Sequence, residues 1–270
     1  MNAKVLTVGN LKGGVGKTTT ATQVAFELSQ RNYRVLLADL DPQANSTNIL
    51  LKTKLNFNKD ADTTINFSLM ESIRNRDLSK SLISITSNLD LLGSSADFAL
   101  FPRYMEQEDR NYLERVKIFD KLLKPLKSAY DYILVDVPPT ISLITDCSLY
   151  ASDWVLIVVQ TQQQSYDGAT SFLSYIQDDV IDQFKAPRLD LVGFLPVMLA
   201  KRSSVDQTVL HNLKKQYGSD NVLNTIIPFM SRLKRYGLTG ITTTGYYDKQ
   251  VAKVYQKVTN EVLERINNND

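Results

Sequence analysis

Cysteine, histidine and long apolar runs are all scarce in this sequence of 270 residues. Its one cysteine, Cys147, cannot form an internal disulfide, so we expect a reducing, cytoplasmic compartment. Its one histidine, His211, has no second histidine with which to share a metal ion, and we expect it at the surface. No stretch approaches the roughly 18 uninterrupted apolar residues of a membrane span, and we expect no targeting segment. These absences argue against a disulfide-stapled fold and against a transmembrane protein.

Net charge is also low, at +2, but it is unevenly distributed. Residues 201–270 carry 11 Lys/Arg and 6 Asp/Glu, whereas residues 1–200 carry 20 and 23. A basic C-terminal quarter on a mildly acidic body suggests one face that meets a polyanion. A solvated basic face would have the same composition, so charge alone leaves both interpretations open.

Apolar strands alternate with segments of helical spacing along the whole chain. The runs that predict strands are Val5–Gly9, Arg34–Asp39, Leu82–Ile85, Leu89–Leu92, Tyr132–Asp136, Trp154–Gln160, Leu189–Leu195 and Val222–Ile227. Those that predict helices include Thr18–Gln30, Asn111–Lys127 and Asp248–Ile266, while residues 52–80 fit neither pattern. The alternation predicts an α/β fold with a mostly parallel central sheet and helices on both faces. At this length we expect a single domain over residues 1–270.

A glycine-rich loop, Leu11-Lys12-Gly13-Gly14-Val15-Gly16-Lys17-Thr18, joins the first strand to the first helix. Such a loop points backbone N–H groups and the positive helix end at phosphates, as in P-loop nucleotide triphosphatases. The pattern predicts Lys17 on the outer phosphates of ATP and the Thr18 hydroxyl on Mg²⁺. The nucleotide contacts we expect here come from Gly13, Gly14, Val15, Gly16, Lys17, Thr18 and Thr19. The loop has Leu11 where the generic pattern has glycine, and a second lysine, Lys12, follows it.

Three aspartates stand at the ends of predicted strands. Asp39 and Asp41 close the second strand, and Asp136 closes the run Tyr132–Asp136 just before Pro138-Pro139. Because the carboxyl ends of parallel strands meet at one edge of a sheet, these side chains are expected near the phosphate loop. Three carboxylates around one Mg²⁺ would supply the charge neutralisation and water orientation that phosphoryl transfer needs.

Three motifs together resemble those of the ParA/MinD family of ATPases. KGGVGKT, with lysine at both ends, resembles the family's deviant Walker A loop, DLDPQAN (Asp39–Asn45) its DLDPQGN, and DVPPT (Asp136–Thr140) its D-x-P-P. The resemblance implies that Lys12 crosses a dimer interface to the partner's nucleotide, as an arginine finger does. It also implies that Asp41 positions the attacking water and that Asp39 and Asp136 support the metal. The active form would then be an ATP-sandwiched homodimer.

The resemblance continues near the C-terminus. Ile227-Pro228 followed by Ser231-Arg232-Leu233 is similar to the family's I-P-x-x-x-R-L segment, which implies that Pro228 and Met230 flank the adenine. Apolar packing would give the same pattern. The stretch Phe229–Tyr236 is more aromatic and basic than is usual in the family.

A short ParA type is the member of the family that the chain resembles most. The type implies Mg²⁺-dependent ATP hydrolysis, nonspecific binding to double-stranded DNA, a nucleoid-associated location and a ParB-like centromere-binding partner. The expected DNA contacts are Lys201, Arg202, Arg232, Lys234 and Arg235, with Lys214, Lys215, Lys249, Lys253 and Lys257 as secondary candidates. The alternative is a MinD-like positioning ATPase that acts on a membrane or protein partner. The last helix argues against it, because its apolar residues fit core packing better than an interfacial stripe.

Overall fold

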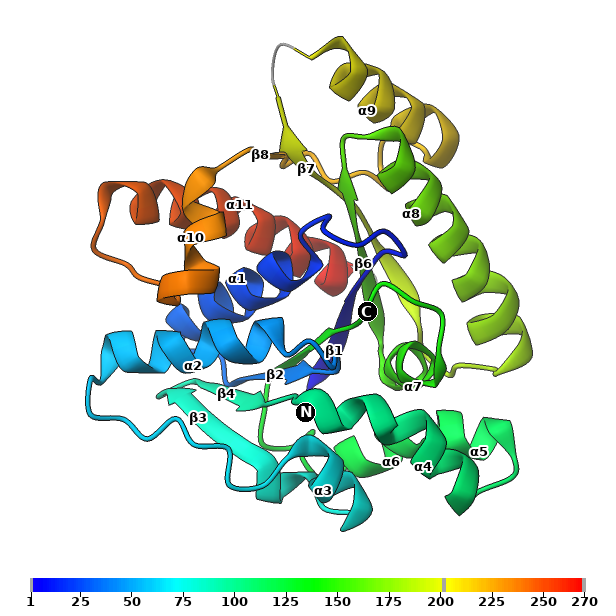
Figure 1. The fold of residues 1–270 in the computed structure, drawn as a ribbon. Coiled ribbons are helices and arrows are strands. Elements are labelled where there is room, and N and C mark those ends of the chain that lie inside the picture. The colour runs from blue at the N-terminus through cyan, green and yellow to red at the C-terminus, as the bar shows by residue number, and fades with distance from the viewer. Residues whose placement is uncertain (1, 201–202, 269–270) are drawn as a thin grey trace.

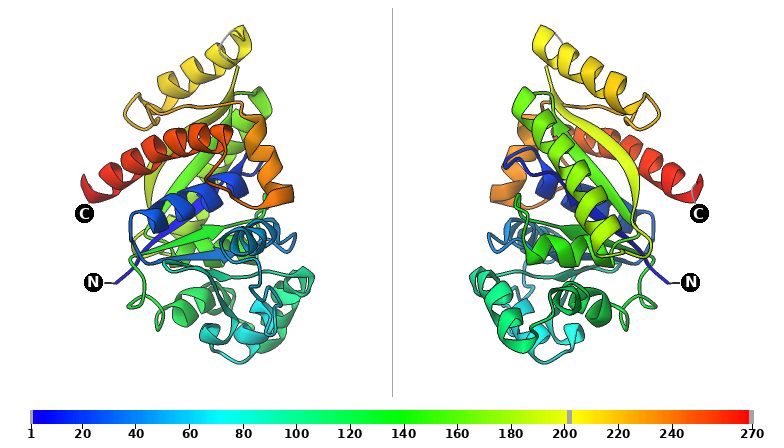
Figure 2. Two further views of the ribbon diagram at one scale, coloured as in Figure 1. Left: turned by 90° about the vertical axis from the view of Figure 1, so that its left-hand side faces the viewer. Right: turned by 90° about the vertical axis from the view of Figure 1, so that its right-hand side faces the viewer.

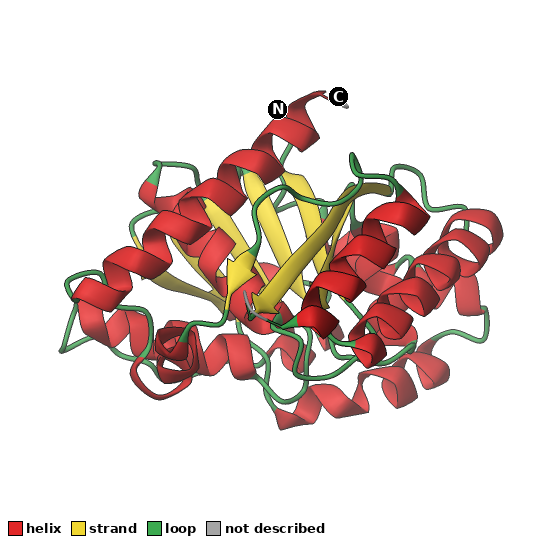
Figure 3. Cartoon of the chain, turned by 90° about the horizontal axis from the view of Figure 1, so that it is seen from above, coloured by secondary structure: helices red, strands yellow, loops and turns green. Residues whose placement is uncertain are grey.

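Successive residues of the central strands enter two different cores, one on each face of the sheet. Val5 and Leu36 are buried in one core, whereas their neighbours Leu6 and Leu37 are buried in the other. This is the alternation that a strand imposes, and it requires every central strand to be apolar on both sides. The computed structural model, which describes residues 2–200 and 203–268, shows the resulting sheet between two layers of helices (Figures 1 and 3).

The sheet has eight strands in the order β3-β4-β2-β5-β1-β6-β7-β8. Its strands are β1 Lys4–Gly9, β2 Val35–Asp39, β3 Leu82–Thr86, β4 Leu89–Leu92, β5 Tyr132–Asp136, β6 Trp154–Gln160, β7 Asp190–Leu199 and β8 Ile227–Pro228. Only β3 runs antiparallel to its neighbour, β4; the other adjacent pairs are parallel. The predicted α/β fold with a mostly parallel sheet is confirmed.

The helices divide between the two faces. They are α1 Lys17–Gln30, α2 Asn45–Phe57, α3 Leu69–Arg74, α4 Phe101–Glu108, α5 Tyr112–Val116, α6 Ile118–Leu123, α7 Leu143–Ala151, α8 Gln163–Tyr175, α9 Ser204–Tyr217, α10 Ser231–Thr239 and α11 Tyr246–Asn268. Both views of Figure 2 show α11 beside α1, and the buried residues of these two helices share one core. The prediction that the last helix is docked on the core is confirmed. In the parts of the chain that the structure describes, none of these helices is both long and apolar enough to cross a membrane.

Two predicted elements are wrong in extent. The helix expected at Asn111–Lys127 is interrupted at Lys117 and ends at Leu123. Pro125 lies two residues beyond this end, where its ring and missing N–H prevent the helix from continuing. The strand expected at Val222–Ile227 is reduced to β8, because the N–H groups of Asn224 and Thr225 donate to the carboxylate of Glu261 instead of to a neighbouring strand.

The segment that fitted neither pattern contains the C-terminal part of α2 and all of α3. Helix α2 packs against α10, and Gly240 marks the point of closest approach. Its φ is +70°, and a Cβ atom there would lie 2.4 Å from the backbone nitrogen of Thr53. Lys52 donates to the carbonyl of Gly237 at 2.6 Å, and the Ile241 N–H donates to the Thr53 hydroxyl at 2.8 Å. Glycine is therefore required at position 240 for α10 to rest on α2.

We predict that Gly240→Ala lowers the free energy of unfolding by about 2–4 kcal/mol, because the methyl group meets backbone atoms and the residue must keep a positive φ. Gly237→Ala is the matched control. It lies inside α10 with open space around it, so it should leave stability unchanged or raise it by up to about 1 kcal/mol. Urea unfolding of both variants measures the difference; equal losses would show that the contact between α2 and α10 is unimportant.

Candidate functional site

The loop between β1 and α1 is shaped to surround an anion. Gly14 and Gly16 have φ values of 78° and 94°, a conformation that favours glycine. Gly16 caps α1 without a side-chain hydrogen bond, so the first N–H groups of the helix face outward. Lys17 is buried, and its Nζ donates to the carbonyl of Lys12 at 3.1 Å. Backbone donors and the Lys17 ammonium thus converge on one small region.

Asn10, which the sequence analysis did not single out, fixes the start of this loop. Its side-chain nitrogen donates to the carbonyls of Val158 at 2.8 Å and Ser165 at 3.1 Å, and its Oδ1 accepts from the Lys12 N–H at 2.8 Å. The side chain is 1 % exposed. The sequence signal was a lone asparagine at the end of an apolar strand. Asn10 therefore ties the backbone of Lys12 to β6 and α8.

Asp136 lies at the end of β5, fully buried beside the loop. Its Oδ2 accepts from the Ser46 hydroxyl at 2.6 Å, while its Oδ1 is buried without a hydrogen-bond partner. Burial raises the pKa of Asp136 to about 6, against the hydrogen bond from Ser46 and the nearby Thr18 hydroxyl, which lower it. Burial also lowers the pKa of Lys17. The negative charges of Asp136 and Asp41 act in the opposite direction but do not cancel this effect. An unpartnered buried carboxylate oxygen near a lysine and a threonine fits a hydrated Mg²⁺.

Asp39 is hydrogen-bonded to the segment that leads into α2. Its Oδ2 accepts from both the N–H and the hydroxyl of Thr47 at 2.8 Å, and its Oδ1 accepts from the Asp41 N–H at 3.1 Å. Burial, with Asp136 beside it, raises the pKa of Asp39 to about 8. Through these bonds Asp39 holds the start of α2.

The expected support of Mg²⁺ by Asp39 and Asp136, with Asp41 beside them, stays a prediction. Within residues 2–200 and 203–268, no group of three or more His, Cys, Asp or Glu side chains is placed to hold a metal ion. Thr18, Asp39 and Asp136 remain predicted metal-supporting residues.

Asp41 begins the turn that leads into α2. Its Oδ1 accepts from the Gln43 N–H at 2.9 Å, and its carbonyl accepts from the Ala44 N–H at 2.8 Å. Ala44 has a φ of 53°, at the position where the similar motif DLDPQGN has glycine. The side chain of Asp41 is half-exposed at the edge of the site, so it can reach a water molecule.

Pro228 and Met230 line one apolar pocket with residues of the phosphate loop. The pocket has a volume of about 80 Å³ and is also bounded by Gly16, Thr19 and Tyr255. The structure thus places the predicted adenine contacts beside the predicted phosphate contacts.

The predicted DNA contacts differ in how far their side chains are available to a ligand. Arg232 is engaged inside the protein: its Nε lies 2.5 Å from Oδ1 of the buried Asp248, and its Nη2 donates to the Thr242 hydroxyl at 2.6 Å. A DNA phosphate would have to compete with this ion pair, so the structure argues against Arg232 as a DNA contact. Lys234 and Arg235 on α10 are exposed. Lys201 and Arg202 lie outside the described residues.

Among the secondary candidates for DNA contacts, Lys214 is half-buried. The other four are exposed: Lys215, Lys249, Lys253 and Lys257. The structure leaves them as predictions. His211 is exposed, which confirms the expectation for it.

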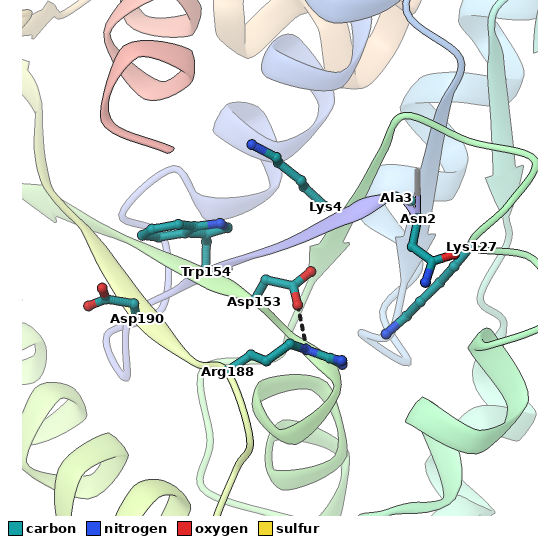
Figure 4. A pocket seen from close by; sticks show the side chains of 8 residues that line it. All are labelled: Asn2, Ala3, Lys4, Lys127, Asp153, Trp154, Arg188 and Asp190. Atoms are coloured by element: carbon teal, nitrogen blue, oxygen red, sulfur yellow. Dashed lines mark ion pairs between the residues drawn. The ribbon is translucent and has the colours of Figure 1, made fainter. Parts of the chain in front are cut away.

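A cavity of about 550 Å³ lies at the amino ends of β1, β6 and β7, away from the phosphate loop (Figure 4). Two of its cations are held in ion pairs: Arg188 with Asp153 at 2.7 Å, and Lys127 with Asp120 at 2.9 Å. We assign it no part in the candidate site.

Comparison with known proteins agrees with this geometry. Residues 3–190 match the protein family described as AAA domain. The sporulation initiation inhibitor protein Soj of Bacillus subtilis is 31% identical over 260 residues, which cover 96% of this chain and 98% of Soj. The chromosome partitioning protein ParA of Myxococcus xanthus is 29% identical over 231 residues, 85% of this chain and 77% of that protein.

Solved structures show the same fold. Cobyrinic acid a,c-diamide synthase from Mycobacterium smegmatis, with bound ATP analog and magnesium, superposes with a TM-score of 0.79 at 26% identity, over 97% of this chain and 94% of that chain. A putative plasmid partition protein from Borrelia burgdorferi bound to AMPPNP gives a TM-score of 0.77 at 23% identity, over 98% and 99% of the two chains.

The hydrogen bond from Ser46 to Asp136 gives a test of the site. Removing a donor from a buried charged group costs about 1–3 kcal/mol, so we predict a loss of this size for Ser46→Ala. The bond favours the carboxylate form, so its removal raises the folded-state pKa of Asp136 further above its unfolded value. The loss should therefore be larger at pH 8, above the pKa of about 6, than at pH 5.

Ser94→Ala is the matched control, because the Ser94 hydroxyl is equally buried but has no partner. Its loss should be smaller and independent of pH. Denaturant unfolding at the two pH values measures both variants, and a pH-independent loss for Ser46→Ala would contradict the assignment.

Proposed function

The chain belongs to the ParA/MinD family of partitioning ATPases, and on that premise we propose that it is an ATP-dependent DNA segregation switch. In this proposal residues 1–270 form one ATPase domain that acts in the cytoplasm, associated with the nucleoid. ATP closes a homodimer, the dimer binds DNA without reading sequence, and a ParB-like centromere-binding protein stimulates hydrolysis. The observation that carries the proposal is the buried, unpartnered Oδ1 of Asp136 beside Lys17 and the phosphate loop.

The residues of the site fit ATP and Mg²⁺. Backbone N–H groups of residues 13–19 and the Lys17 ammonium would hold the phosphates, with Pro228 and Met230 against the adenine. The Thr18 hydroxyl and Asp136, the latter through water, would hold Mg²⁺, which neutralises charge on the phosphates when bound.

Hydrolysis of ATP to ADP and phosphate requires an oriented water more than a strong base. We assign this orientation to Asp41, whose half-exposed carboxylate stands at the edge of the site. Lys12 would reach the phosphates of the other subunit. Its backbone is fixed by Asn10, and its half-exposed side chain supports a contact outside its own subunit.

The basic residues Lys234 and Arg235 lie next to the predicted adenine pocket. Leu233 and Lys234 line that pocket, and Arg235 is the next residue along the chain. Both lie on α10 and are exposed. Contacts from such side chains go to DNA phosphates, so binding would be nonspecific and would weaken steeply with salt. Proximity to the base would allow nucleotide binding to influence the DNA-binding surface.

We predict that a non-hydrolysable ATP analogue with Mg²⁺ doubles the molar mass of the protein, measured by light scattering after size-exclusion chromatography. Lys12→Ala should keep the mass of one subunit while binding the analogue within about threefold of the wild-type affinity, because its contact is to the partner's nucleotide. Asp41→Ala should hydrolyse ATP far more slowly and remain a dimer in ATP. A wild-type mass of one subunit at saturating analogue would refute the proposed dimer.

We predict that Lys234→Glu combined with Arg235→Glu weakens ATP-dependent binding to random duplex DNA by at least about tenfold at moderate salt. Arg232 stays unchanged in this variant, because its replacement would leave Asp248 buried without its cation. The control is Arg103→Glu combined with Arg110→Glu, the same charge change at exposed positions on and just after α4. A filter-binding assay compares them.

Equal losses in the two double variants would remove Lys234 and Arg235 from the DNA contacts. Wild-type protein that binds anionic liposomes in ATP, and not DNA, would favour the alternative of a MinD-like positioning ATPase.

A further inference from the structure

A pocket outside the nucleotide site combines aromatic rings with carboxylates. It lies beside α5, α7 and the π-helix Ile176–Gln183, which continues α8, and its volume is about 290 Å³. Three aromatic residues, Tyr112, Tyr175 and Phe184, form part of its wall, together with Asp146 and Asp179. The rings of Tyr112 and Phe184 lie 5.8 Å apart between centroids. We call this feature the acidic aromatic pocket.

The π-helix explains how one side of the pocket is built. Phe184 donates its N–H to the carbonyl of Asp179 at 2.8 Å, the five-residue spacing of a π-helical turn. Asp179, Gln183 and Phe184 all line the pocket. Helices of this kind are rare and occur frequently at functional sites. The wider turn thus places a carboxylate and a ring on the same wall.

The deepest carboxylate has no cationic partner. Asp146 is 2 % exposed, and its two oxygens accept from the hydroxyls of Tyr112 and Tyr175. Among the described residues, no Lys or Arg nitrogen lies within 4 Å of a carboxylate oxygen of Asp146 or Asp179. Burial first, and then the charge of Asp179, raises the pKa of Asp146. Two like charges therefore face the same cavity.

One basic side chain contacts the pocket wall, but its ion pair is with a carboxylate outside the pocket. The guanidinium of Arg115 lies 5.0 Å from the centroid of the Tyr112 ring, and its ion pair is with Glu106 at 3.7 Å. A cation entering the pocket would meet the carboxylate of Asp179 and three aromatic rings, while the buried Asp146, hydrogen-bonded to Tyr112 and Tyr175, adds negative charge; this chemistry recognises ammonium and guanidinium groups.

We propose that the acidic aromatic pocket binds an alkylammonium or guanidinium group, and that this group is the lysine or arginine side chain of a partner protein. Two exposed apolar side chains argue for a polypeptide: Ile141 and Tyr112, both lining the pocket, are 55 % and 40 % exposed. Interfaces commonly surround a charged anchor with such apolar contacts. The proposal concerns a site of its own and does not require nucleotide.

Isothermal titration of the nucleotide-free protein with N-acetyl-arginine amide and N-acetyl-lysine amide tests this directly. We expect millimolar binding by these single side chains and none by the neutral N-acetyl-glutamine amide. Asp179→Asn should weaken binding by about tenfold, because it removes a charge-assisted contact at the pocket wall. Asp178→Asn is the matched control, since Asp178 precedes it on the same π-helix, is exposed and does not line the pocket.

Spermidine in a parallel titration distinguishes a free polyamine from a protein side chain as the source of the cation. Binding of spermidine at least tenfold tighter than of both amides would overturn the assignment to a partner protein. Absence of binding by both amides at about 50 mM, where a millimolar site would be saturated, would overturn the pocket. Equal weakening of amide binding by Asp178→Asn and Asp179→Asn would also overturn the pocket, because it would show that the effect comes from general surface charge. Thermal unfolding of both variants checks that each remains folded.

Discussion

Two carboxylates buried side by side are the constraint on which the rest of this structure depends. Asp39 and Asp136 are register partners at the ends of β2 and β5, and burial raises the pKa of both. Neither could remain there without compensation, because an unpaired buried charge costs several kcal/mol. The compensation comes from hydroxyl and N–H groups at the start of α2 and from α1. These two carboxylates therefore also determine how the two helices meet the sheet.

This arrangement explains why the site is polar inside an otherwise apolar fold. Hydrogen bonds from Thr47 occupy one oxygen of Asp39, and Ser46 occupies one oxygen of Asp136. One oxygen of Asp136 remains for a ligand. The two carboxylates therefore differ: Asp39 accepts backbone N–H groups of Asp41 and Thr47, whereas one oxygen of Asp136 has no partner.

Much of this could be read from the sequence, for physical reasons that differ by element. The central strands were predictable because burial on both faces demands continuous apolar runs, and the phosphate loop because few other sequences place three glycines between a strand and a helix. Helix α2 was not predictable from periodicity, since its buried residues include Ser46, Thr47 and Thr53. Ser46 donates to Asp136, and the Thr53 hydroxyl accepts from the N–H of Ile241; both partners are distant in sequence. The internal pairing of Arg232 with Asp248 was hidden for the same reason, because sixteen residues separate the two.

Helix α2 also acts as a spacer of fixed length. It begins at the carboxylates and ends against α10, and its 13 residues span about 20 Å at 1.5 Å per residue. One residue inserted in its middle would rotate the distal half by about 100° and turn Thr53 away from Gly240. The length of α2 is therefore under a strict constraint, although the amino-acid composition of the helix gives no sign of this. Relatives that share the phosphate loop but differ in the length of α2 would have to carry their C-terminal surface at another angle.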